Sequence, residues 1–203
     1  MTGYQVPSKQ VEFSEKIKNS QFVTRIANVD SVEAARRFLK LLNNQFPDAT
    51  HHCWAYIVGN PESTTLVGCS DDGEPSGTAG KPMLNVLQHS GLGDIMAVCT
   101  RYYGGTKLGT GGLSRAYGGG VKQALELVKI KSKIDYIHVQ FTVDYENIKS
   151  CENLLSNFEC KDIVVDYEEQ VTFKLAVDET TASQLKSQLY DLLKGKLEWN
   201  IIK

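Results

Sequence analysis

The chain has 203 residues, 41% of them apolar and 23% charged, which is typical of a globular protein and leaves room for two small domains. It has no run of about 18 apolar residues and no basic N-terminal region followed by an apolar stretch, so neither a membrane span nor a secretion signal is expected. Its five cysteines are widely spaced and never form a CxxC pair, which argues against a disulfide framework and a zinc knuckle. We expect a cytoplasmic protein in a reducing compartment, with no membrane partner.

The formal net charge of −2 hides an asymmetry between the two parts of the chain. Residues 1–135 carry 15 basic and 12 acidic side chains, whereas residues 136–203 carry 7 and 12. Because phosphates attract positive charge, a nucleic acid would meet the first part. We predict one domain over 1–135 and a second over 136–203, with the polar segment 129–135 as a linker.

In the first part, hydrophobic periodicity and turn residues predict strands mixed with helices. The expected elements are two strands within 10–29, broken near Lys18; a helix capped by Asp30 and ended by Pro47; strands over 51–58 and 65–69; a helix from Pro82 to about Ser90, with Gly91 as its C-cap; a strand buried on both faces over 95–100; and a helix from about Leu113. Residues 70–81 are turn formers at nearly every position, so we expect a loop there.

The last of these helices would contain Gly118, Gly119 and Gly120. Each glycine costs about 1 kcal/mol relative to alanine in a helix interior. Close packing of this turn on a strand would explain them, and so would the approach of a ligand to the helix backbone. From the sequence, both explanations stay open.

The second part alternates strand, helix, strand, strand, helix and strand. The expected strands cover 136–144, 162–168, 171–177 and 196–202, and the expected helices cover about 148–158 and 179–194. This order within so short a segment predicts the split-βαβ, ferredoxin-like fold.

The glycine-rich segment 101–120 follows the buried strand and is the most informative part of the chain. It holds three tyrosines and three cations, and no Asp or Glu occurs between Ile95 and Leu125. Glycines let backbone N–H groups approach a ligand, and exposed rings beside cations are typical of proteins that bind single-stranded RNA. We predict binding of nucleic acid or phosphate through Arg101, Tyr102, Tyr103, Gly104, Gly105, Lys107, Gly109, Gly111, Gly112, Arg115 and Lys122. Strand alternation would turn one of the two adjacent tyrosines to solvent, although both rings could also lie in the core.

The loop over 70–81 is expected to form a wall that faces this segment, through Asp71, Asp72, Gly73, Glu74 and Lys81. The amides that open the following helix would suit an anion together with Lys81, although the loop could equally be a rigid turn. The loop lacks the GxxxxGK spacing and a Ser or Thr after the lysine, so nucleotide hydrolysis of the Walker type is not expected.

Metal and catalytic sites are not expected either. Three acids in one turn are usually solvated or paired with cations rather than bound to a metal. His51, His52 and Cys53 are neighbours in a strand, so their side chains alternate between its faces, and core packing or hydrogen bonding is the expected role. Cys99 and Cys151 are expected to be buried, unreactive thiols. We predict no metal, no cofactor and no catalytic residue.

Four segments together resemble the YigZ/IMPACT family: HHCWAY at 51–56, SDDGEPSGTAGKP at 70–82, RYYGG at 101–105 and LGTGGLSRAYGGG at 108–120. The resemblance implies an α+β fold, with a first domain similar to the second domain of ribosomal protein S-five and to domain IV of elongation factor G. It implies a second domain similar to the ferredoxin-like C-terminal domain of that factor. Because those relatives contact ribosomal RNA, the resemblance also implies a role linked to RNA or the ribosome. Eukaryotic IMPACT proteins regulate translation through a kinase-activating partner, but they use an additional N-terminal RWD domain, so that partner is not expected here.

We therefore expect a non-enzymatic protein that binds RNA or the ribosome and regulates translation. The acidic second domain would orient the complex or meet a basic ribosomal protein. The alternative is a small-molecule enzyme similar to the GHMP kinases, whose glycine-rich phosphate loop also opens a helix. Arg115 departs from the Ser-Ser-Ala pattern of those loops, and a hydrolase would need a ligand set that the sequence does not suggest.

Overall fold

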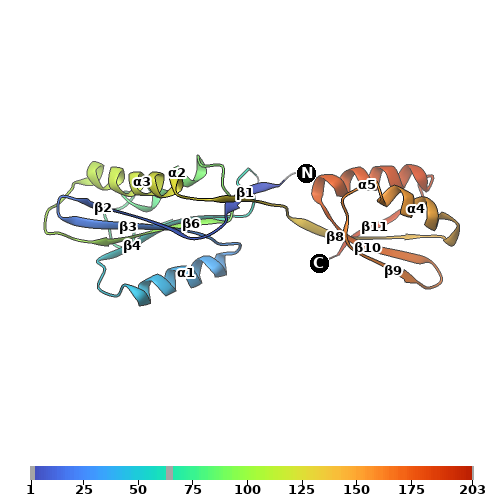
Figure 1. The fold of residues 1–203 in the computed structure, drawn as a ribbon, viewed down its shortest axis with the longest axis horizontal. Coiled ribbons are helices and arrows are strands. Elements are labelled where there is room, and N and C mark those ends of the chain that lie inside the picture. The colour runs from blue at the N-terminus through green and yellow to red at the C-terminus, as the bar shows by residue number, and fades with distance from the viewer. Residues whose placement is uncertain (1–2, 63–65, 203) are drawn as a thin grey trace. The chain divides into compact units, whose positions relative to one another are not determined.

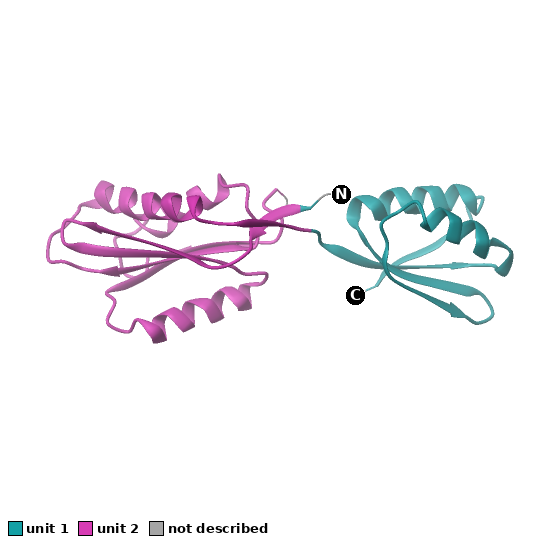
Figure 2. Cartoon of the chain, in the orientation of Figure 1, with its two compact units in different colours: residues 1–3, 134–203 teal, residues 4–133 magenta. Residues whose placement is uncertain are grey.

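The computed structural model describes residues 3–62 and 66–202. The described chain divides into two compact units, residues 4–133 and residues 134–202 together with Gly3 (Figure 2). Each unit has its own hydrophobic core. The division falls between Lys133 and Ile134, two residues before the boundary expected from the sequence. No helix of the described residues is both long enough and apolar enough to cross a membrane.

The N-terminal unit is built on an antiparallel sheet with helices on both faces (Figure 1). Its strands are β2 (Val11–Ile17), β3 (Ser20–Asn28), β4 (His51–Val58), β5 (Leu66–Ser70) and β6 (Ile95–Tyr102), in the order β2-β3-β6-β4-β5. Helix α1 (Val32–Gln45) covers one face, and α2 (Gly80–Gln88) and α3 (Thr110–Glu126) cover the other. Strand β6 lies at the centre between two layers of helices, so the prediction of a strand buried on both faces is confirmed.

Several element boundaries differ from the expected ones. The N-cap of α1 is Ser31, whose side chain accepts the N–H of Ala34 at 3.1 Å, and not Asp30. Helix α2 begins two residues before Pro82. Helix α3 begins at Thr110, before the expected start near Leu113, because the glycines of its first turn show no apolar periodicity from which the start could be predicted. The hairpin break near Lys18 is confirmed, with Lys18 and Asn19 at φ 45° and 66°, the left-handed region that tight two-residue hairpins use. The first residue of the expected strand 65–69 lies outside the described residues.

The segment expected to be a linker contains a strand. Strand β7 (Ile130–Lys133) pairs in antiparallel fashion with β1 (Tyr4–Pro7). Buried Asp94 supports this pair: its carboxylate accepts hydrogen bonds from the Tyr4 hydroxyl at 2.9 Å, from the Gly59 N–H at 2.7 Å and from Lys133. A four-residue polar strand whose partner lies at the other end of the unit leaves no periodic signal in the sequence.

The C-terminal unit has the predicted order of elements. They are β8 (Tyr136–Val143), a short 3-10 turn (Tyr145–Asn147), α4 (Ile148–Leu155), β9 (Lys161–Tyr167), β10 (Val171–Asp178), α5 (Glu179–Leu192) and β11 (Glu198–Ile202). The sheet order is β11-β8-β10-β9, with both helices on one face (Figure 1). The α+β fold with a ferredoxin-like second domain is confirmed.

Candidate anion-binding surfaces of the N-terminal unit

Arg101 is not the exposed phosphate contact that the sequence suggested. Its side chain is 5% exposed, and its guanidinium donates to the carboxylate of Glu74 and, at 3.3 Å, to the hydroxyl of Ser20. Alternation along β6 turns Arg101 toward the face of the sheet that α2 and α3 cover, where the hydroxyl of Tyr117 on α3 also donates to Glu74 at 2.7 Å. The guanidinium is therefore neutralised inside the protein, which corrects its predicted role as a free phosphate contact.

The carboxylate of Asp71 accepts hydrogen bonds from the backbone amides that were expected to bind an external anion. It accepts the backbone N–H groups of Gly77, Ala79 and Gly80 at 2.7, 2.9 and 2.8 Å. Burial disfavours its charged form, but these three hydrogen bonds outweigh burial and hold the pKa of Asp71 below its usual value. The Asp71 carboxylate therefore caps the N-terminus of α2, whose N-cap residue Ala79 supplies no side-chain hydrogen bond, and the prediction that these amides receive an external anion is wrong.

The rest of the acidic loop is hydrogen-bonded to β4. The Asp72 carboxylate accepts the backbone N–H of His52 at 2.6 Å, and its carbonyl oxygen lies 2.7 Å from Nδ1 of His51. The thiol of Cys53 donates to the carbonyl of Asp71 at 3.0 Å. The hydrogen-bonding role expected for these strand residues is confirmed. Within residues 3–62 and 66–202, no three His, Cys, Asp or Glu side chains gather in a way that could hold a metal ion.

Burial makes the thiols of Cys99 and Cys151 unreactive, because it disfavours the thiolate. Burial raises the pKa of Cys99 to about 12 and that of Cys151 to about 11. Both cysteines are fully buried, as their apolar neighbours in the sequence predicted.

The other predicted cations differ from Arg101. In the part of the chain that the structure describes, Lys107, Arg115 and Lys122 form no ion pair with a carboxylate. They divide between two hollows that meet at Leu108. The structure therefore separates the single basic site expected from the sequence into two places.

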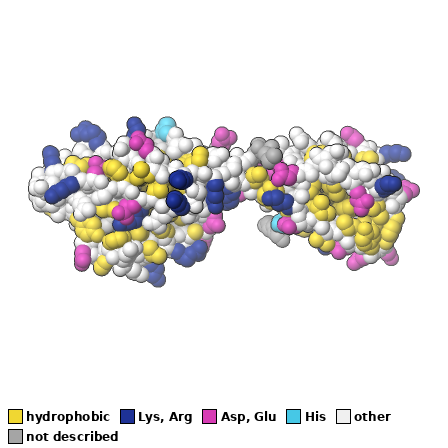
Figure 3. Space-filling view, viewed as in Figure 1, with side chains coloured by type: hydrophobic (Ala, Val, Ile, Leu, Met, Phe, Trp, Pro, Cys, Tyr) yellow, Lys and Arg dark blue, Asp and Glu magenta, His cyan; other side chains and the backbone are white. Residues whose placement is uncertain are grey.

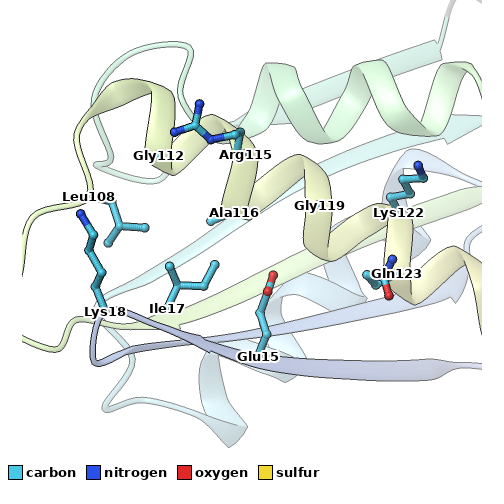
Figure 4. Close-up of a pocket in the computed structure, with 10 residues that line it drawn as sticks. All are labelled: Glu15, Ile17, Lys18, Leu108, Gly112, Arg115, Ala116, Gly119, Lys122 and Gln123. Carbon is cyan, nitrogen blue, oxygen red and sulfur yellow. The ribbon is translucent and has the colours of Figure 1, made fainter.

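The first hollow, which we call the α3–β2 groove, lies between the outer face of α3 and the first hairpin and measures about 370 Å³ (Figure 4). Arg115 and Lys122 rise from α3, and Lys18 stands at the hairpin on the opposite side. Burial raises the pKa of Glu15, which points from β2 toward the helix. The lining residues are Glu15, Ile17, Lys18, Leu108, Gly112, Arg115, Ala116, Gly119, Lys122 and Gln123.

The consecutive glycines of α3 have different environments. A Cβ on Gly120 would lie 2.7 Å from the hydroxyl oxygen of Thr24, so close packing on β3 explains that glycine. A Cβ on Gly118 would make only ordinary contacts with Pro82 and Val86. A Cβ on Gly119 would have no neighbour within 4 Å, and Gly119 lines the α3–β2 groove. Packing therefore accounts for Gly120 and leaves Gly119 unexplained.

The second hollow, which we call the N-terminal hollow, lies where α3 begins and measures about 430 Å³. The loop over 70–81 lines it through Glu74 and Pro75, and Lys107 and Gly109 line it from the segment before α3, whereas Asp71, Asp72, Gly73 and Lys81 do not line it. The lining residues are Thr50, His51, Glu74, Pro75, Arg101, Tyr103, Lys107, Leu108, Gly109, Thr110 and Leu113.

The remaining predicted residues have mixed roles. Tyr103 is 45% exposed and Tyr102 is partly buried, so the two rings are not both in the core. Gly104 is required by packing, because a Cβ there would lie 2.1 Å from the backbone of Asn19. Gly105 and Gly111 have open space or only a loose contact beside them. Sequence reasoning missed Lys18 and Glu15, which only the packing of β2 against α3 brings to the groove.

The two units present different surfaces. On the face drawn in Figure 3, cations are spread over the N-terminal unit and apolar side chains gather over the C-terminal unit. Exposed apolar residues of the C-terminal unit include Val164, Tyr167 and Ile201, which are 51%, 61% and 67% exposed.

Comparisons with known proteins cover both units. The Impact N-terminal domain model matches residues 18–125, which include most of both hollows. The chain is 41% identical over 197 residues to an IMPACT family member of Haemophilus influenzae, covering 97% of this chain and 96% of that one. It is 41% identical over 198 residues to the IMPACT family member YigZ of Escherichia coli, covering 98% and 97%. A crystal structure of a hypothetical protein with 41% identity covers 100% of this chain and 98% of its own, with a TM-score of 0.73.

Proposed function

Since the chain belongs to the IMPACT family, we propose that it is a non-enzymatic regulator of translation whose N-terminal unit binds RNA, on the ribosome, through the α3–β2 groove. The observation that carries this proposal is the bare helix backbone at Gly119, which lies between the cations of the groove. The acidic C-terminal unit would meet a basic ribosomal protein.

The cations of the groove are placed to hold a phosphate backbone. Arg115 and Lys122 are seven residues apart on α3, so they lie on one face about 11 Å apart along the axis. Lys18 faces them across the groove. Only Glu15 opposes this positive charge among the lining residues, and its burial favours the neutral form.

Gly119 supports close approach of a partner. A glycine inside a helix destabilises it by about 1 kcal/mol relative to alanine, and no packing contact of Gly119 offsets that cost. A bare turn between two cations instead admits a phosphate or ribose to the helix surface. Gly112, about two helical turns earlier, also lines the groove, although a Cβ there would lie 3.0 Å from that of Leu108.

The residues that line the groove also indicate whether the base sequence of the RNA would affect binding. Of the described residues that line the α3–β2 groove, none is aromatic. Stacking on bases is therefore not available there, and the contacts are with the sugar–phosphate backbone. We expect RNA binding with little dependence on base sequence.

The salt dependence of binding tests the proposal. Fluorescence anisotropy with a labelled 12-nucleotide oligouridine should give a slope of log K against log salt of about −2, since three cations each contribute about −0.7 on a single strand. Arg115→Glu and Lys122→Glu should each weaken binding at least fivefold and flatten the slope. Arg37→Glu on α1, at the opposite face of the sheet, changes net charge equally and should leave affinity within twofold. A flat slope, or an equal loss with Arg37→Glu, would refute RNA binding in the groove.

Cosedimentation with ribosomes tests the location. The unaltered chain should pellet with ribosomes at low salt, and the Arg115→Glu chain should remain in the supernatant. Pelleting of both chains to the same extent would show that the groove is not the contact.

A further inference from the structure

We propose that Glu15 selects RNA over DNA in the α3–β2 groove, because its carboxylate accepts a hydrogen bond from a ribose 2′-hydroxyl group. Since this role concerns a strand bound in the groove, it rests on the proposed function. The cations of the groove cannot provide the selection themselves. Lys18, Arg115 and Lys122 would contact phosphates, which RNA and DNA share.

Glu15 lies opposite the bare turn of α3. It belongs to the alternate residues of β2 that face the helix, and Figure 4 shows its side chain pointing from the strand toward that turn. A Cβ on Gly120 would lie 3.7 Å from Oε1 of Glu15, and a Cβ on the adjacent Gly119 would have no neighbour within 4 Å. A partner that reaches the bare turn therefore also comes within reach of this carboxylate.

The Glu15 carboxylate has no partner of its own. Within residues 3–62 and 66–202, it forms neither an ion pair nor a hydrogen bond. Burial raises the pKa of Glu15, since water is partly removed and no donor replaces it. An ionised carboxylate accepts hydrogen bonds and donates none, so an uncharged donor completes it. A hydroxyl group meets this requirement, and a phosphate does not.

The two cations of α3 would place a sugar at this point. Arg115 and Lys122 lie on either side of Gly119 and Gly120 along the helix, and Glu15 faces the part between them. Phosphates and sugars alternate along a nucleic-acid strand, so a strand whose phosphates reach both cations presents a sugar between them. The charge of Glu15 reinforces this register, because a carboxylate repels a phosphate and attracts a hydroxyl group.

The sugar hydroxyl separates the two kinds of nucleic acid. Ribose has a 2′-hydroxyl group that donates and accepts, and deoxyribose has none. Acidic side chains also accept from this hydroxyl in dinucleotide-binding folds, and a hydrogen bond to an ionised acceptor is stronger than one between neutral groups. Beside deoxyribose, Glu15 would remain a partly buried charge without a donor, which weakens binding. Gln123, the uncharged polar side chain of the lining, donates as well as accepts and so suits either strand.

Anisotropy titrations of the full chain with three labelled 12-nucleotide strands test the selection: oligouridine, oligodeoxyuridine and 2′-O-methyl oligouridine. Oligouridine should bind at least fivefold more tightly than oligodeoxyuridine. The 2′-O-methyl strand should bind as weakly as the DNA strand, because its oxygen has no proton to donate. Equal affinity for oligouridine and oligodeoxyuridine would overturn the role of Glu15 and leave nucleic-acid binding in the groove intact. Failure of all three strands to bind would overturn the proposed function as well.

Glu15→Ala tests whether the preference comes from this residue. The variant should bind oligouridine and oligodeoxyuridine within twofold of each other, and its affinity for oligodeoxyuridine should rise because a repulsion is removed. Both strands are measured on the same chain, so a partial loss of folding would lower both affinities and leave their ratio unchanged. Glu33→Ala removes an exposed acid from α1, at the opposite face of the sheet, and should keep the preference. An undiminished preference in Glu15→Ala, or an equal loss in Glu33→Ala, would show that Glu15 does not distinguish the sugars.

Discussion

The guanidinium of Arg101 binds the carboxylate of Glu74 in the interior of the N-terminal unit, where the two side chains are 5% and 4% exposed. The residues are 27 positions apart, and the pair joins β6 to the loop before α2. The same contact removes Arg101 from the charges available to a partner and shapes a wall of the N-terminal hollow.

Replacing one member of this pair should destabilise the unit strongly. Glu74→Gln keeps the shape of the side chain but leaves a buried cation uncompensated, for which we expect a loss of about 3–5 kcal/mol in the free energy of unfolding. Urea denaturation at pH 7 measures it. The control is Glu33→Gln, which removes an exposed ion pair to Arg36 and should change stability by less than about 0.5 kcal/mol. A loss of equal size in both variants would contradict the buried pairing.

The cap formed by Asp71 should make stability depend on pH in the acidic range. The folded-state pKa is lowered, so the stabilisation is fully present above the unfolded value near 3.8 and disappears as pH falls through the folded value. Asp71→Asn should therefore cost about 1–2 kcal/mol at pH 7, and the difference from the unaltered chain should narrow below about pH 4. Thermal unfolding from pH 2.5 to 7 measures this, with exposed Asp48→Asn as the control. A difference in stability between Asp71→Asn and the unaltered chain that stays constant across this pH range would rule out the charged cap.

The adjacent glycines of α3 should respond in opposite directions to the same methyl group. Gly119→Ala meets open space and should stabilise the fold by about 0.5–1 kcal/mol through helix propensity. Gly120→Ala should destabilise it by about 1–3 kcal/mol, since its Cβ would overlap the hydroxyl of Thr24. Urea denaturation measures both changes. If RNA approaches Gly119, the Gly119→Ala chain should bind oligouridine more weakly although it is more stable. An increase in both oligouridine affinity and stability would argue against close approach of RNA to the helix.

The carboxylate of Asp94 should control the pairing of β1 with β7. Asp94 has φ 47°, a conformation that asparagine also tolerates, so Asp94→Asn changes the charge without straining the backbone. Loss of the ion pair to Lys133 should speed amide exchange in β7 at least tenfold and leave the centre of β6 unchanged. Uniform acceleration throughout the unit would indicate global destabilisation instead.

Local patterns were sufficient for the elements that pack by a single face. The alternation over 136–143 and the helical spacing of Cys151 and Leu155 predicted the order of the C-terminal unit correctly. The pairing of β1 with β7 could not be predicted, because strands of four residues are too short to show a periodic pattern and their partners lie far apart in the sequence. The N-cap of α1 was missed by one residue for a similar reason: Asp30 and Ser31 are both good caps, and backbone geometry selects Ser31.

The sequence by itself determined where the unusual chemistry lies, because glycines, cations and the absence of acids between Ile95 and Leu125 are properties of composition. Only the tertiary structure decided which of those groups are free. Residues from other elements supply the partners: Glu74 neutralises Arg101, and Thr24 packs against Gly120. The strength of a charge and the need for a glycine depend on what lies within a few ångströms, and those neighbours come from distant parts of the chain.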